Sequence, residues 1–126
     1  ISISEAAPPP AVDLTVAPYA SVNRSGVVTL KGTVTCTSED GSGILWDVYG
    51  QLTQRVGRML IRGWFYSFVG APCDGTATPW EAQVVGDVGI FKGGKAASVT
   101  FAFGCTTGGC SDGYVEKTIQ IRGGKR

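Results

Sequence analysis

Four cysteines, at positions 36, 73, 105 and 110, are the most reactive side chains in this sequence of 126 residues. Cys105 and Cys110 bracket four small residues in the stretch FGCTTGGCSDGY (103–114). A zinc site needs four converging ligands, and the chain has no histidine and only this one local cysteine pair. A redox pair would have C-x-x-C spacing at a helix N-terminus. We therefore expect structural disulfides, with no metal site and no cofactor.

Four cysteines allow three pairings. The small residues between Cys105 and Cys110 can turn the chain sharply, so local geometry favours a bridge between these two. That bridge leaves Cys36 to pair with Cys73. The alternative is an immunoglobulin-like Cys36–Cys105 bridge, because both cysteines end inward-facing strand patterns.

Other motifs that could carry chemistry have simpler interpretations. The segment GIFKGGK (89–95) has the G-x-x-x-x-G-K spacing of a phosphate loop, but Ala96 replaces the required Ser or Thr and a strand follows. The segment SEDGSG (38–43) offers oxygen ligands without the spacing of a calcium loop, so we expect a turn.

Catalytic groups are sparse. Without histidine, a Ser-His-Asp or Cys-His arrangement is impossible. A carboxylate pair for glycoside hydrolysis is conceivable, but we expect solvated surface charges and no enzyme. The carboxylates considered are Asp47, Asp74, Glu81 and Asp87.

Aromatic side chains are the strongest remaining functional signal. In RGWFYSF (62–68) they fall on both faces of one expected strand, so some must be exposed or covered by a loop, ligand or partner. In the structural interpretation, Trp64 and Tyr66 pack on one sheet face beneath loops. In the functional interpretation, they form a stacking platform for sugar rings or an apolar ligand. The candidate ligand contacts are Trp46, Trp64, Tyr66 and Trp80.

Alternating apolar and polar residues predict the elements that hold these side chains. The pattern in 27–38 points Val28, Leu30, Val34 and Cys36 inward. The run 95–105 repeats it, and we expect Ala97, Val99, Phe101, Phe103 and Cys105 to point inward. Further strands are expected at 11–18, 44–54, 58–68, 80–87 and 114–122. No helical period occurs, so the fold class is an all-β, immunoglobulin-like antiparallel β-sandwich of about seven strands with two disulfides.

Length and charge define the setting of this sandwich. We expect one domain at 11–122, between a flexible proline-rich segment at 1–10 and a loose tail at 123–126. The net charge of +1 argues against nucleic-acid binding, and no window is apolar enough for a transmembrane segment. An even cysteine count in a small chain is typical of secreted domains, so we expect a secreted protein. We also expect it to be a monomer. The opening ISISEAAPPP is then the start of a mature chain without its signal peptide.

The segments GTVTCT (32–37), CDGTATPW (73–80), GIFKGGKA (89–96) and GCTTGGC (104–110) together resemble a family of small secreted domains of actinobacteria, such as streptomycetes, whose function is unknown. The resemblance spans about residues 11–122. It implies a secreted immunoglobulin-like sandwich with its cysteines paired first to second and third to fourth. It implies no catalytic residue.

A narrower resemblance concerns CTTGGC (105–110), which is similar to the C-T-T-x-x-C loop of the neocarzinostatin-type apoproteins. Those secreted, two-disulfide domains hold an apolar chromophore in a cleft. The other bridge departs from that family, which closes a short loop, whereas Cys36 and Cys73 are far apart in this sequence.

These observations predict a secreted, non-enzymatic binding or interaction module. Its partner is not identified by the sequence; a cell-wall polysaccharide, another protein or a small apolar ligand would each fit the aromatic residues. The alternative function is carriage of a small apolar ligand in a cleft near the Cys105–Cys110 loop.

Overall fold

The computed structural model describes residues 9–123, and these residues form strands and turns without a helix. They contain no helix that could cross a membrane. The expected flexible segment at 1–10 and tail at 123–126 lie almost wholly outside the described residues; Gly123 is the last residue of a strand. The eight strands are β1 (Ala11–Val16), β2 (Tyr19–Val22), β3 (Val28–Thr37), β4 (Ile44–Val56), β5 (Met59–Pro72), β6 (Asp74–Val84), β7 (Gly94–Thr106) and β8 (Gly109–Gly123).

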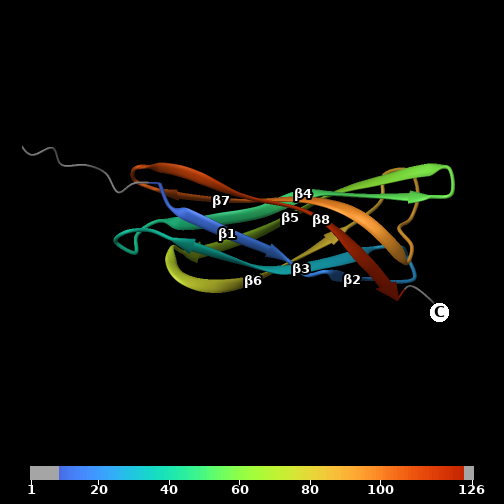
Figure 1. The fold of residues 1–126 in the computed structure, drawn as a ribbon, viewed down its shortest axis with the longest axis horizontal. Coiled ribbons are helices and arrows are strands. Elements are labelled where there is room, and N and C mark those ends of the chain that lie inside the picture. Colours follow the sequence, from blue (N-terminus) through green and yellow to red (C-terminus); the bar gives the residue numbers. More distant parts are fainter. Residues whose placement is uncertain (1–8, 124–126) are drawn as a thin grey trace, which may run out of the picture.

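The strands form two layers, with β7 and β4 along one side of the molecule and β6, β3 and β2 along the other (Figure 1). One layer has the order β1-β3-β6, and the other has the order β8-β7-β4-β5. The short strand β2 pairs antiparallel with β3 and parallel with β8, so it joins the layers along one side. The predicted immunoglobulin-like β-sandwich is confirmed.

The count of eight strands arises because the strand expected at 11–18 is shorter and a second strand follows it. Pro18 has no backbone N–H and cannot continue the ladder with β3. Ala17 makes the last bond to β3 before Pro18, from its N–H to the Lys31 carbonyl oxygen, at 2.8 Å. The Pro18 carbonyl then accepts the N–H of Gln120 at 2.9 Å, which starts the pairing of β2 with β8.

The inward face of β3 is as predicted. Val28, Leu30, Val34 and Cys36 are all buried and belong to the core between the layers. Polar residues alternate with them along the strand, as expected where one face of a strand is buried.

The inward face of β7 is the opposite of the prediction. Ala96, Ser98, Thr100, Ala102 and Gly104 are buried, whereas Ala97, Val99, Phe101, Phe103 and Cys105 lie on the outer face. Little room is left beneath β7. A Cβ atom on Gly104 would lie 3.1 Å from the Cys36 sulfur and 3.3 Å from Val12, so the core accepts only small residues there.

Both predicted disulfides are present. Cys36 is bonded to Cys73, with 4.4 Å between Cα atoms, and Cys105 to Cys110, with 4.0 Å. The alternative Cys36–Cys105 pairing is wrong, although Cys36 lies beside Gly104. Cys105 and Cys110 are directly opposite residues in the β7–β8 hairpin, so their bridge closes the turn.

Candidate functional site

The outer face of the β8-β7-β4-β5 layer carries a group of aromatic side chains, which we call the aromatic face. They alternate along their strands with buried residues and therefore share the solvent side of the sheet. Its members are Tyr49, Trp64, Tyr66, Phe68, Phe101, Phe103 and Tyr114. The most exposed are Trp64 at 73%, Phe68 at 65% and Tyr66 at 59%.

Strand register aligns four of these residues in one row across the sheet. Tyr66 is opposite Tyr49, Tyr49 is opposite Phe101, and Phe101 is opposite Tyr114. The Tyr49 and Phe101 rings are stacked with centroids 5.5 Å apart and planes 18° apart. The Phe101 and Tyr114 rings are tilted, with centroids 5.0 Å apart. The row is therefore continuous from β4 to β8, with Tyr66 adjoining it on β5.

The rows on either side contain both apolar and polar side chains. Trp64 is aligned with Gln51, Val99 and Glu116. Phe68 is aligned with Asp47, Phe103 and Asp112. In addition, the Tyr66 hydroxyl donates a hydrogen bond of 3.1 Å to Oδ2 of Asp47. The face thus combines ring surfaces with acceptors for hydrogen bonds.

The surroundings raise the pKa values of three tyrosines on the face. Partial desolvation is the largest cause for Tyr49, Tyr66 and Tyr114. Neighbouring carboxylates add to it, because a negative charge opposes loss of the phenol proton. They are Asp112 and Asp47 for Tyr49, Asp47 for Tyr66 and Glu116 for Tyr114. All three hydroxyls therefore stay protonated at neutral pH and can donate hydrogen bonds.

The structure brings together two of the four candidate contacts. Trp64 and Tyr66 lie on the aromatic face and are exposed, so the interpretation that loops cover them is wrong. Trp46 is 43% exposed at the β-bulge between Leu45 and Asp47 and does not belong to the three rows.

Trp80 does not lie at the surface, because its position on β6 points into the core. It is 4% exposed and stacks on Phe65, with ring centroids 6.1 Å apart. Its Nε1–H donates to the Thr15 carbonyl at 3.1 Å, which satisfies the polar end of the indole. A role in surface ligand contact would require this packing to open.

Sequence reasoning missed Tyr49, Phe101, Phe103 and Tyr114 as members of this face. These residues come from three strands, and only the register of those strands places them together. The available signal was on β7, where one alternating set is bulky and the other is small. The alternation alone predicts that the bulky set faces the core, although a bulky outer set also fits the pattern.

The carboxylates considered for catalysis have other surroundings. Asp74 accepts the N–H of Thr76 at 3.0 Å, and Asp87 accepts the N–H of Arg62 at 3.0 Å. These hydrogen bonds are the largest cause of the lowered pKa of each carboxyl group. Asp47 and Glu81 lie on β4 and β6, in different layers.

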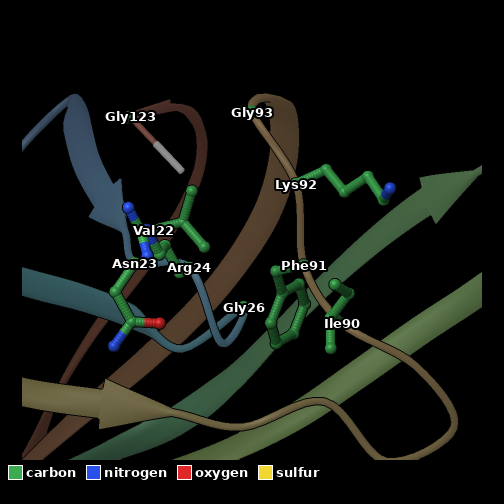
Figure 2. A pocket seen from close by; sticks show the side chains of 9 residues that line it. All are labelled: Val22, Asn23, Arg24, Gly26, Ile90, Phe91, Lys92, Gly93 and Gly123. Atoms are coloured by element: carbon green, nitrogen blue, oxygen red, sulfur yellow. The ribbon is translucent and has the colours of Figure 1, made fainter. Parts of the chain in front are cut away.

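The segment 89–95 leads into β7 and is held by a buried side chain rather than arranged around a ligand. Gln54 accepts the Lys92 N–H at 2.9 Å and donates to the Lys92 carbonyl at 2.8 Å. A hollow of about 250 Å³ lies beside it, and Figure 2 shows the Lys92 side chain pointing away from Asn23 and Arg24 across this hollow. The two cationic side chains therefore do not converge on one point.

The segment 38–43 is a turn, as predicted. Asp40 accepts hydrogen bonds from the N–H and the hydroxyl of Ser42, at 3.0 and 2.6 Å. Among residues 9–123, no group of three or more His, Cys, Asp or Glu side chains is placed to hold a metal ion.

Comparisons with known proteins find distant likeness in structure alone. No protein-family model matches the chain. A search of curated proteins finds no relative. A solved structure of AggA, the major subunit of aggregative adherence fimbriae type I from Escherichia coli, is similar with a TM-score of 0.46 and 12% sequence identity, over 94% of this chain and 98% of that chain. A likeness at this level carries no information about function.

Proposed function

We propose that this chain works outside the cell as a non-enzymatic binding module whose aromatic face takes up the sugar rings of a neutral polysaccharide. The single observation that carries the proposal is the row of four aromatic residues across four strands, with Trp64 and Phe68 exposed beside it. The two disulfides support a place outside the cell, because such bonds persist in oxidising compartments.

Exposure of so many rings needs a reason. Single apolar residues at the surface are ordinary, but a contiguous apolar patch marks an interaction site in soluble proteins. Here the exposed rings are neighbours in register rather than scattered. Covering them with a ligand removes apolar surface from water, which favours binding by about 25 cal/mol for each Å².

The chemistry between the rings favours a sugar over a protein partner. The centres of protein–protein interfaces are depleted of charged residues. This face instead places acidic side chains within its rows, at Asp47, Asp112 and Glu116. A sugar ring has an apolar C–H face, which stacks on an aromatic ring, and hydroxyl groups at its edge, which donate to carboxylates.

The charge of the face favours a neutral ligand. Its three rows contain three acidic residues and no Lys or Arg. Negative potential over the face repels phosphate or uronate groups. Neutral glucans and N-acetylated polysaccharides avoid this repulsion.

The experiment is affinity electrophoresis in gels containing neutral polysaccharides, together with titration of tryptophan fluorescence. We expect retardation of the wild type, and about a fivefold loss of affinity in Trp64→Ala, because one ring stacking contributes on the order of 1 kcal/mol. Tyr19→Ala is the matched control, since Tyr19 is similarly exposed on β2 but lies outside the aromatic face beneath Arg122. Absence of any shift with neutral polysaccharides, or equal losses in both variants, would contradict the proposal.

Carriage of a small apolar ligand beside the Cys105–Cys110 bridge stays a prediction. The hollow shown in Figure 2 is lined by residues near the start of β7, and the bridge lies at the other end of that strand. Native mass spectrometry of the protein from its own producer tests it, because a persistently ligand-free species would argue against carriage.

A further inference from the structure

Strand β5 ends its layer and has one open edge. In the part of the chain that the structure describes, β5 pairs with β4 and with no other strand. An edge strand presents unpaired N–H and C=O groups that can template pairing with another chain, and proteins usually block such edges with charges, proline or bulges. Part of β5 is blocked in these ways and part is not.

The first block is at Arg62. Its N–H donates to Oδ1 of Asp87 at 3.0 Å, and its carbonyl accepts the N–H of Asp87 at 2.8 Å. Asp87 thus covers the edge that faces away from β4. Backbone groups alternate between the two edges of an antiparallel strand. Every second residue after Arg62, namely Trp64, Tyr66 and Phe68, therefore directs its N–H and C=O to this open edge.

The second block is at Gly70. Its φ of 63° interrupts the extended backbone, next to the bulge between Leu45 and Asp47. Pro72, which has no N–H, follows on the same edge. Between the two blocks, the segment GWFYSFV (63–69) contains no charged residue and no proline. It is the unprotected part of the edge.

We propose that two copies of this chain pair antiparallel along this open edge, with Tyr66 opposite Tyr66 of the second copy. Arg62 and Gly70 are each four positions from Tyr66. A two-fold axis at Tyr66 therefore places Arg62 of each copy opposite Gly70 of the other. Trp64 then lies opposite Phe68 of the second copy on the outer face. Each aromatic residue of the outer face is thereby opposite another, as favoured in antiparallel pairs.

The occupant is a second copy because the segment is complementary to itself. Paired antiparallel about Tyr66, its open-edge residues offer as many N–H donors as carbonyl acceptors, in matching positions. Like charges directly opposite would oppose pairing, and this segment has none. A pairing of this length buries little surface, so the dimer is weak and its population depends on protein concentration.

Pairing would extend the sheet rather than cover the aromatic face. It uses the backbone edge, while the side chains of Trp64, Tyr66 and Phe68 stay on the outer side of the sheet. The aromatic rows of two copies would then be continuous across the axis. This inference does not depend on the proposed polysaccharide binding, and it departs from the monomer expected from the sequence.

Sedimentation velocity between about 10 μM and 1 mM tests the pairing, a range that spans weak dissociation constants. We expect the wild type to shift from monomer toward dimer. The variant Trp64→Lys with Phe68→Lys places lysine opposite lysine twice and should stay monomeric. The matched variant Trp64→Lys with Phe68→Glu places opposite charges together twice, so it should form the dimer at low salt and lose it as salt rises.

A cysteine substitution tests the register independently of charge. Directly opposite residues in a hydrogen-bonded antiparallel pair have Cα atoms about 5.5 Å apart, which a disulfide can span. Tyr66→Cys should therefore form an intermolecular disulfide under mild oxidation. In the control, Trp64→Cys, the two cysteines are four residues out of register, and cross-linking should be at least tenfold slower. Native disulfides and thermal unfolding of both variants are checked by mass spectrometry and circular dichroism.

A wild type that stays monomeric to 1 mM overturns the proposal. That result is expected if the natural occupant of this edge is an extended segment of another protein. So does a dimer that the two lysines leave intact, or equal cross-linking of both cysteine variants. Polysaccharide binding is measured at about 1 μM, where the weak dimer is dissociated. The two proposals can therefore fail separately.

Discussion

Strand β5 carries aromatic side chains on both faces, and their surroundings differ completely. On the inner face, Phe65 stacks against Trp80 of the opposite layer, and both are buried. On the outer face, Trp64 and Tyr66 are mostly exposed. Alternation separates these neighbours, but only the position of the second layer decides which set becomes core. Similar residue types are therefore packed in the core on one side and exposed to solvent on the other.

The largest expected effect distinguishes the two tryptophans of this comparison. Trp80→Ala should lower the free energy of unfolding by about 3–5 kcal/mol, because it leaves a cavity beside Phe65. Trp64→Ala should change it by less than about 0.5 kcal/mol, since the side chain is exposed. Urea unfolding followed by circular dichroism measures both. If the two variants lose similar amounts of unfolding free energy, Trp64 must be packed against something that covers the outer face.

The two disulfides extend the comparison, since Cys36–Cys73 is buried while Cys105–Cys110 closes a hairpin at the rim. Replacing Cys36 and Cys73 together by alanine should cost about 4 kcal/mol, and replacing Cys105 and Cys110 about 2 kcal/mol, because the longer loop restricts the unfolded chain more. The same unfolding measurement ranks them. The reverse order would show that strain or packing, rather than loop length, sets their contributions.

A smaller effect of opposite sign is expected inside β7. The Thr100 hydroxyl is fully buried and has no hydrogen-bond partner within residues 9–123. Thr100→Val keeps the shape and removes the unsatisfied group, so it should raise the free energy of unfolding by about 1 kcal/mol. Thr118→Val, on the exposed outer face of β8, is the control. Its free energy of unfolding should stay within about 0.5 kcal/mol of the wild-type value. A loss of stability in Thr100→Val would indicate an ordered water bound to the hydroxyl.

The smallest effect concerns the protection of the β5 edge at acid pH. The hydrogen bond from the Arg62 N–H holds the pKa of Asp87 below its ordinary value. A lowered folded-state pKa gives stability that is present above the unfolded pKa, near 4, and is lost as pH falls through the folded pKa. Asp87→Asn should therefore lose less stability than the wild type between pH 5 and pH 2.5. Asp13→Asn, at an exposed site on β1, is the control; an unchanged profile in Asp87→Asn would exclude this contribution.

The sequence predicts where residues alternate along a strand better than it predicts which of the two alternating sets is buried. On β3 the inward set is apolar and the outward set is polar, so only one orientation is reasonable. On β7 both sets can be buried, because Ala, Ser, Thr and Gly are small and the alternate set is apolar. The opposite layer decides which set is buried, since Val12 and Cys36 leave little room for a Cβ at Gly104.

The candidate site was predictable only in part, for the same reason. The presence of aromatics on both faces of 62–68 indicates that some are exposed, and Trp64 and Tyr66 are. Nothing near Trp80 in the sequence distinguishes it from them. Its burial depends on Phe65 and on the Thr15 carbonyl, 65 positions away along the chain. Pairwise contacts of this kind arise from the fold and leave no local pattern.

The parallel pairing of β2 with β8 has a mechanical consequence. Tyr19 to Val22 lie beside Gln120 to Gly123 in matched order, so four residue pairs join an early strand to the last one. Tension that draws residue 9 and residue 123 apart along the strand axis acts across these pairs in shear. The hydrogen bonds between β2 and β8 then bear the force together. In an antiparallel pair pulled from one end, the bonds open one at a time.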